Sequence, residues 1–184
     1  MRKLWLGAGI VALVLAFGVA TVATAGGDRK GRGGDRHDGK QGLRAKLKGA
    51  SEVPAISTVA RGKFRADIRG EEIHYTLSYS GLQGPVRFAH IHFAQEDVNG
   101  AVVAFLCGGG GKPACPQSGE VTGVITPADV MATSGPPDQG IAAGEFGEFV
   151  AAIKRELTYV NVHSDKFPGG EIRGQIEGGH EDDD

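Results

Sequence analysis

Apolar and polar residues alternate one by one over three stretches in the first half of the chain. In Leu43–Lys48 the apolar residues alternate with Arg and Lys, and the same pattern returns in Lys63–Arg69 and Ile73–Ser80. A period of two is typical of a β-strand with one face on a core and the other in water, whereas an amphipathic helix would show a period of 3.6. Because a polar turn containing Gly70 separates the second and third stretches, we predict that they form a hairpin.

The rest of the central region continues in short β-type runs separated by turns. Further strands are expected at Phe88–Phe93, Ala101–Leu106, Glu120–Thr126, Thr158–His163 and Glu171–Ile176. Apolar residues follow a helical spacing in Phe146–Glu156, and a helical turn is expected at Ala128–Met131 in the loop from Pro127 to Gly144. The sequence therefore predicts an all-β fold, an antiparallel Greek-key sandwich or barrel of about eight strands with one short helix near 146–156.

The two ends of the chain differ in composition from this β-rich region. Residues 1–25 have a basic start, an apolar run and an Ala-x-Ala site, which predict a secretory signal peptide, with an uncleaved membrane anchor as the alternative. Residues 26–41 are predicted to be a disordered linker and residues 178–184 an acidic disordered tail, so that one β domain spans 42–177. We therefore expect a secreted or periplasmic protein that meets a membrane only through the signal segment before cleavage.

Charge and cysteine content narrow the expected partners. The 184-residue chain has a formal net charge of −2, and loss of Arg2 and Lys3 with the signal peptide would take it to −4. Nucleic acid is therefore not an expected partner, and an unknown protein or a small anion remains. The two cysteines, Cys107 and Cys115, are expected to form a disulfide in an exported protein; the alternative is a pair of soft metal ligands.

The stretch Phe88–Phe93 contains the strongest candidate for a functional site. Since side chains alternate along a strand, His90 and His92 share one face roughly 6.6–6.8 Å apart, close enough for both imidazoles to reach one ion. His163 falls on the corresponding side of its own strand, opposite Val160 and Val162. If both apolar sets face one core, all three histidines lie outside it and can meet on adjacent strands. The remaining histidines are expected to be dispensable: His37, His74 and His180.

Four separated motifs occur in order along the β-rich region: Glu52-Val53-Pro54, His90-Ile91-His92, Tyr159–His163 and Gly169–Gly174. In these motifs the chain resembles the CHRD (chordin-type) domain family, and the resemblance extends from about Leu43 to Ile176. It implies an immunoglobulin-like β-barrel in an extracellular or exported protein. Because no activity is firmly attached to that family, the resemblance implies a fold and a location more than a function.

A more distant resemblance is to the Cu/Zn superoxide dismutases, whose copper strand carries His-x-His after a Gly-Leu-x-Gly turn. This resemblance implies site roles for His90, His92, His163 and Arg173. The metal-bridging histidine, the His/His/Asp zinc loop and the disulfide of those enzymes have no counterpart here. A dinuclear site is therefore excluded, and a mononuclear three-histidine site for Cu or Zn remains.

Three further side chains are candidates for supporting such a site. Asn161 and Glu171 are expected to orient imidazole N–H groups, and Arg173 to attract small anions to an open metal position. The alternatives are structural, hydrogen-bonded histidines and an ion pair of Arg173 with Glu171 or Asp165. No residue is assigned a catalytic role.

Three classes of function agree with these residues. The first, which we favour, is an exported metal-binding module. The second is an extracellular protein-interaction or matrix module in which the histidines are structural. The third is a copper redox enzyme of dismutase-like type. An enzyme is thus the less favoured outcome.

Overall fold

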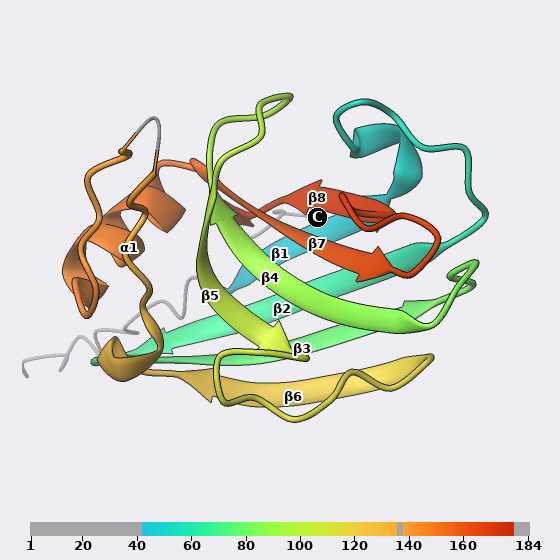
Figure 1. Cartoon of the computed structure of the whole chain (residues 1–184). Helices are drawn as coiled ribbons and strands as arrows, with labels where there is room; N and C mark the ends of the chain where they lie inside the picture. The colour runs from blue at the N-terminus through green and yellow to red at the C-terminus, as the bar shows by residue number, and fades with distance from the viewer. Residues whose placement is uncertain (1–41, 136–137, 179–184) are drawn as a thin grey trace, which may run out of the picture. The chain divides into compact units, whose positions relative to one another are not determined.

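The computed structural model describes residues 42–135 and 138–178, and these residues form a single β-sheet with one short α-helix (Figure 1). The predicted signal peptide and linker lie outside the described residues, as does the predicted acidic tail apart from Gly178. No helix in the described ranges is long and apolar enough to cross a membrane.

All the predicted strands are present, and their pairing is antiparallel throughout. The strands are β1 (Leu43–Lys48), β2 (Arg61–Arg69), β3 (Glu72–Ser80), β4 (Val86–Phe93), β5 (Ala101–Cys107), β6 (Gly119–Ile125), β7 (Thr158–Ser164), β8 (Ile172–Gln175) and the two-residue β9 (Glu177–Gly178). The last predicted strand, Glu171–Ile176, is shorter than expected by one residue at each end, and the two-residue β9 that follows it pairs with β1, as β8 does.

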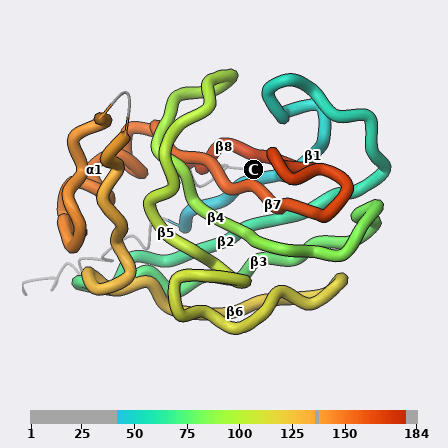
Figure 2. Tube along the Cα trace, in the orientation of Figure 1, coloured from blue at the N-terminus to red at the C-terminus, as the bar shows by residue number. Residues whose placement is uncertain are grey.

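The order of the strands in the sheet is β5-β4-β7-β8-β1-β2-β3-β6. The sheet curls into a nearly closed barrel in which β4, β5 and β7 cross in front of β1, β2 and β3 in the view of Figure 1, and the same path can be followed along the trace in Figure 2. The all-β, antiparallel fold class with about eight strands is therefore confirmed.

The alternation seen in the sequence sets the two faces of the sheet. Leu47, Phe64 and Leu77 are almost fully buried inside the barrel, and the basic residues between them in the sequence are exposed. The predicted hairpin is present, with Ile68 opposite Ile73 and Gly70 in the left-handed turn (φ 61°) that favours glycine. Burial of the apolar face is thus what fixes the register of these strands.

The helix α1 (Phe146–Lys154) confirms the helical spacing predicted there. It buries Phe146, Phe149, Ala152 and Ile153. The helical turn expected at Ala128–Met131 is a 3-10 turn one residue earlier, η2 (Pro127–Asp129), because Thr126 and Asp129 cap each other at its start. A second 3-10 turn, η1 (Gly49–Ser51), follows β1.

The predicted pairing of the two cysteines is confirmed, since Cys107 at the end of β5 and Cys115 in the following loop form a disulfide. The loop that it closes carries a run of glycines, and a Cβ built at Gly109 or Gly110 would lie within 3 Å of the Phe105 ring. The disulfide loop therefore lies directly against Phe105, which is itself a neighbour of the candidate site.

Candidate metal centre

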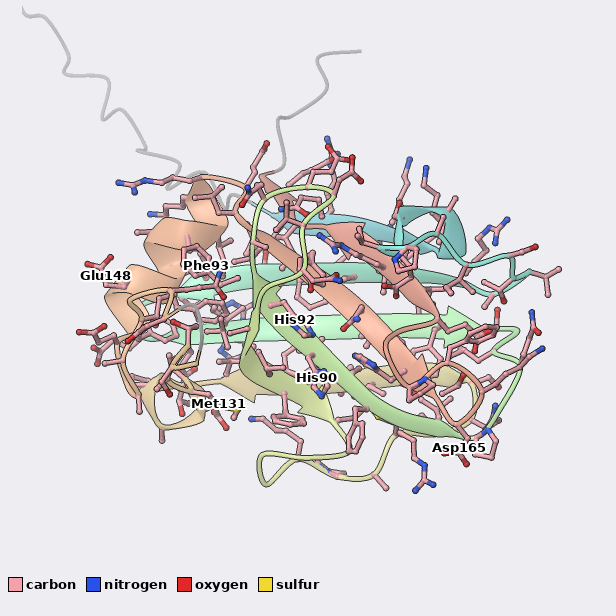
Figure 3. The ribbon with its side chains drawn as sticks, turned by 45° about the horizontal axis from the view of Figure 1, so that its top comes forward. His90, His92, Phe93, Met131, Glu148 and Asp165 are labelled. Atoms are coloured by element: carbon pink, nitrogen blue, oxygen red, sulfur yellow. A yellow bond between two sulfur atoms is a disulfide. The ribbon has the colours of Figure 1, made fainter. Side chains whose placement is uncertain are left out.

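The three histidines lie on β4 and β7, which are adjacent antiparallel strands. His90 is in register with Asn161, and His163 is in register with Phe88, two pairs further along the ladder. Ile91 faces the core, which turns His90 and His92 to the opposite face, as Figure 3 shows for these two side chains. The parity predicted from the sequence is therefore the observed one.

The ladder between β4 and β5 is irregular at the same place. Register shifts occur between Ala89 and His90 and again between Ile91 and His92, whereas the β4–β7 ladder is regular from Ala89 to Phe93. Such β-bulges re-aim side chains and are frequent beside functional sites. Here both bulges lie on the β5 side, so the alignment of β4 with β7 is unaffected.

The imidazole rings come close enough to share one ion. One ring nitrogen from each of His90, His92 and His163 lies within 4.8 Å of the other two. Three atoms no more than 4.8 Å apart all lie within about 2.8 Å of a common centre, so movements of less than about 1 Å would bring them to the 2.0–2.1 Å of a Zn–N bond. The structure thus brings together the three histidines that the sequence analysis singled out.

These histidines are buried although they lie on the outer face of the sheet. The exposed fractions are 7% for His90, 8% for His92 and 7% for His163. Phe105 packs edge-on against the His90 ring at 4.4 Å between centroids, and Phe88 stacks on the same ring at 5.6 Å. Aromatic side chains rather than the barrel core therefore exclude water from this cluster.

Burial makes the histidines hard to protonate. Loss of hydration lowers the pKa of His90 to about 3, and repulsion from His163 and His92 adds to this effect. Burial also lowers the pKa of His92 to about 4, in spite of the hydrogen bond to the Gly100 carbonyl that favours the charged ring. The pKa of His163 is lowered by burial as well. All three rings are therefore neutral near pH 7, which is the form that binds a metal ion.

The hydrogen bonds leave unused nitrogen atoms in the centre of the cluster. Nδ1 of His92 lies 2.9 Å from the carbonyl oxygen of Gly100. Because a carbonyl oxygen can only accept, this Nδ1 is the donor, and the Nε2 of the neutral ring carries a lone pair. In the part of the chain that the structure describes, this Nε2 and both ring nitrogens of His90 are buried without a hydrogen-bond partner. Unsatisfied buried polar atoms are rare and costly, so these three nitrogens need an explanation.

His163 is held by two neighbours. Its Nδ1 lies 2.9 Å from the Pro168 carbonyl and its Nε2 lies 2.9 Å from Oδ1 of Asn161. A neutral imidazole has one N–H, so it can donate to only one of these two oxygens. The Asn161 side chain is thus a direct neighbour of the His163 imidazole.

The other two predicted supporting residues act differently from the prediction. The Glu171 carboxylate accepts hydrogen bonds from the hydroxyls of Thr58 (2.8 Å) and Ser164 (2.6 Å) and from the backbone N–H of Gln83, rather than from a histidine. This carboxylate joins the loop before β2 and the loop after β3 to the end of β7. Its hydrogen bonds therefore organise loops and do not orient an imidazole.

Arg173 shares the outer face with the histidines but is only 2% exposed. Its guanidinium lies 3.4 Å from the centre of the Tyr159 ring and donates to the carbonyl of Val98 at 2.8 Å and to Oδ1 of Asn99 at 3.2 Å. It therefore forms no ion pair with Glu171 or Asp165, and the latter pairs with Arg87. These contacts hold the loop between β4 and β5 in place and leave little of the guanidinium to attract anions.

Two residues beside the cluster had no site role in the sequence analysis. Tyr159 stacks on His92 with the rings nearly parallel (4°) and 4.7 Å apart. Glu52 is 7% exposed, and burial raises its pKa to about 7 although Arg173 and Asn161 oppose the shift. Both Tyr159 and Glu52 lie within the four sequence motifs, which could have marked them as candidates. A motif does not indicate which long-range contacts its residues make.

Glu52 also lines a pocket of about 190 Å³ together with the Phe167–Gly170 loop. A Cβ at Gly170 would lie 2.6 Å from Oε1 of Glu52, and Gly170 has a φ of 125°, which favours glycine. The loop thus approaches Glu52 as closely as it does because position 170 has no side chain.

Comparison with known families agrees with this architecture. A family model described as CHRD domain matches residues 43–176, which extend from the start of β1 to just past β8. The chain belongs to the CHRD domain family. No curated protein and no solved structure matches the chain. In this CHRD domain, the matched residues include the three histidines, Glu52 and the disulfide.

Proposed function

We propose that this CHRD domain is an exported metal-binding module in which His90, His92 and His163 bind one Cu(II) or Zn(II) ion. The observation that carries the proposal is the convergence of three buried imidazoles, with one ring nitrogen of each within 4.8 Å of the other two. In the described residues, both nitrogens of His90 and Nε2 of His92 have no hydrogen-bond partner. Imidazole suits both metals, and at equal availability the affinity order of divalent ions favours copper. Three protein ligands leave a fourth position open for water or a small anion.

The surroundings of the histidines support this function over a purely structural role. A histidine that ties strands together uses both ring nitrogens in hydrogen bonds, but His90 uses neither. The carbonyl of Gly100 accepts from Nδ1 of His92, which leaves its Nε2 to bind the ion. His163 contacts Pro168 and Asn161 through its two ring nitrogens, so one of these contacts gives way when the ion binds. Export is supported by the disulfide and by the CHRD family, whose members are typically extracellular.

Titration of the purified, metal-free protein with Cu(II) and with Zn(II) tests the proposal. We expect one ion per chain, loss of this binding in His90→Ala, and unchanged binding in the matched control His74→Ala. His74 is suitable because it lies on β3 and contacts Glu72 instead of the cluster. Equal affinity of the parent and His90→Ala would leave the histidines a structural role and favour a protein-interaction module.

A further inference from the structure

A second surface feature lies on the strands β1 and β2. The outward-facing residues of these strands are basic and stand directly opposite one another, with Lys46 opposite Lys63 and Lys48 opposite Arg61. All four side chains are exposed. Arg65 extends the set along β2, opposite Arg44, which itself lies in register with Glu177.

This arrangement opposes folding rather than supporting it. Like charges directly opposite on neighbouring antiparallel strands destabilise the pair. Within the described ranges, Lys46, Lys48, Lys63 and Arg65 form no ion pair that would relieve the repulsion. The inward-facing residues alone set the register, so the outward positions are free to carry any polar residue.

Protection of a sheet edge does not explain the charges either. Lysines often occupy edge strands, where they prevent pairing with another molecule. Here β1 lies between β8 and β2, and β2 lies between β1 and β3, so both strands are in the interior of the sheet. A ligand that neutralises the charges would account for their presence.

The neighbouring strand β3 adds hydroxyl groups to the same face. Ser78 and Ser80 lie in register with Lys63 and Arg61. A shallow hollow of about 480 Å³ lies over these positions. Its polar lining comes from Arg61, Lys63, Ser78, Ser80, Ser118 and Glu120. The basic rows are therefore bordered by a recess with several hydroxyl groups and a single carboxylate.

We propose that this basic face of β1 and β2 binds a linear acidic polysaccharide. The cations are spaced roughly 6.6–6.8 Å along each strand and 4.7–4.9 Å between strands, which presents a regular array to a polymer with repeated sulfate or carboxylate groups. The serine hydroxyls can hydrogen-bond to sugar hydroxyls in the adjoining hollow. This inference is independent of the metal centre, which lies on β4 and β7.

Two other polyanions fit the face less well. Single-stranded nucleic acid is held by exposed aromatic side chains on which bases stack, and a membrane surface is held by apolar side chains that enter it. In the described part of the chain, the exposed large apolar side chains lie outside β1, β2, β3 and β6: Val59, Phe88, Val98 and Met131. A face whose polar groups are mainly cations and hydroxyls is suited to a sugar polymer.

The test compares the full chain with the double variant Lys46→Gln/Lys63→Gln. Its matched control, Lys154→Gln/Arg155→Gln, removes the same charge from exposed positions at the end of α1. Binding to dextran sulfate and to polygalacturonate is measured with neutral dextran as the uncharged control polymer. NaCl is varied from about 0.05 to about 0.2 M, so that the slope of log K against log salt concentration can be determined. We expect the β1–β2 variant to bind at least about tenfold more weakly, and its salt slope to fall by about two.

Thermal unfolding supplies a second measurement. At low salt the β1–β2 variant should have a higher melting temperature than the parent, because a like-charge pair is removed, and the control should not. Equal polysaccharide affinity in parent and variant, or an equal loss in the control, would overturn the proposal. Tighter binding to oligo(dT) or to anionic phospholipid vesicles would assign the face to another class of partner. Binding that appears only after deletion of residues 179–184 would assign it to the acidic end of the chain itself.

Discussion

Acidification of the metal-free protein should reveal how Glu52 and the histidines oppose each other. Below the ordinary histidine pKa of 6.5, the unfolded chain takes up protons that folded His90 and His92, with pKa values of about 3 and 4, do not. Stability from these residues is therefore fully present above pH 6.5 and is lost as the pH falls towards 4. Glu52 acts in the opposite sense, because its folded-state pKa of about 7 exceeds the ordinary value of 4.5.

The size of each contribution follows from these values. Between pH 7 and pH 5, His90 and His92 each remove about 2 kcal/mol from the free energy of unfolding, and Glu52 returns about 2 kcal/mol. The parent should therefore lose about 2 kcal/mol over this range. The variant Glu52→Gln has no carboxyl to protonate and should lose about 4 kcal/mol. The lowered pKa of His163 adds to the loss in both proteins.

Urea unfolding of the two proteins at pH 7 and pH 5, followed by circular dichroism, measures these losses. Carboxyl groups on the protein surface titrate alike in both proteins, so the difference between the two losses isolates Glu52. Equal losses in parent and variant would show that Glu52 is ionised in the folded protein at pH 7. A parent that gains stability at pH 5 would refute the assignment of neutral, buried histidines.

Two further outcomes are expected. Gly170→Ala should lower the free energy of unfolding by about 1–3 kcal/mol, because the new Cβ meets Glu52 and the backbone is left-handed there. The adjacent control Gly169→Ala has open space around the new Cβ and should change this free energy little. Equal effects of the two substitutions in chemical denaturation would contradict this reasoning. If the N-terminal segment is a cleaved signal peptide, mass spectrometry of the protein from its native compartment should show a chain that starts at Gly26, and intact Met1 in a membrane fraction would argue for an anchor.

The sequence predicted best what depends on local periodicity. Alternation located the strands, and the same parity rule placed His90, His92 and His163 on one outer face. A parity rule says nothing about what covers that face. The packing of Phe105 on His90 depends on β5 and its bulges, so it was not visible in the spacing of the histidines.

Contacts between residues distant in the sequence account for the remaining differences. Arg173 reaches Val98 and Asn99 across 75 and 74 positions, and Glu171 reaches Thr58 across 113. A site role for Arg173 was expected from the resemblance to the dismutases, and Glu171 was expected to orient an imidazole N–H group. The strand order, in which β7 and β8 separate β4 from β1, brings loops beside them that no local pattern indicates.

The ladder between β4 and β7 is regular beside the histidines, whereas the ladder between β4 and β5 contains two bulges. This difference affects how the sequences of the family can diverge. A shift of one residue in β4 between Ala89 and Phe93, or in the facing part of β7, would turn a ligand inwards to the core. On the β5 side, the bulges already absorb two extra residues, so an insertion or deletion there can be accommodated without rotating a histidine. Differences in length among related genes should therefore accumulate in β5 and its loops, while β4 and β7 evolve by substitution alone.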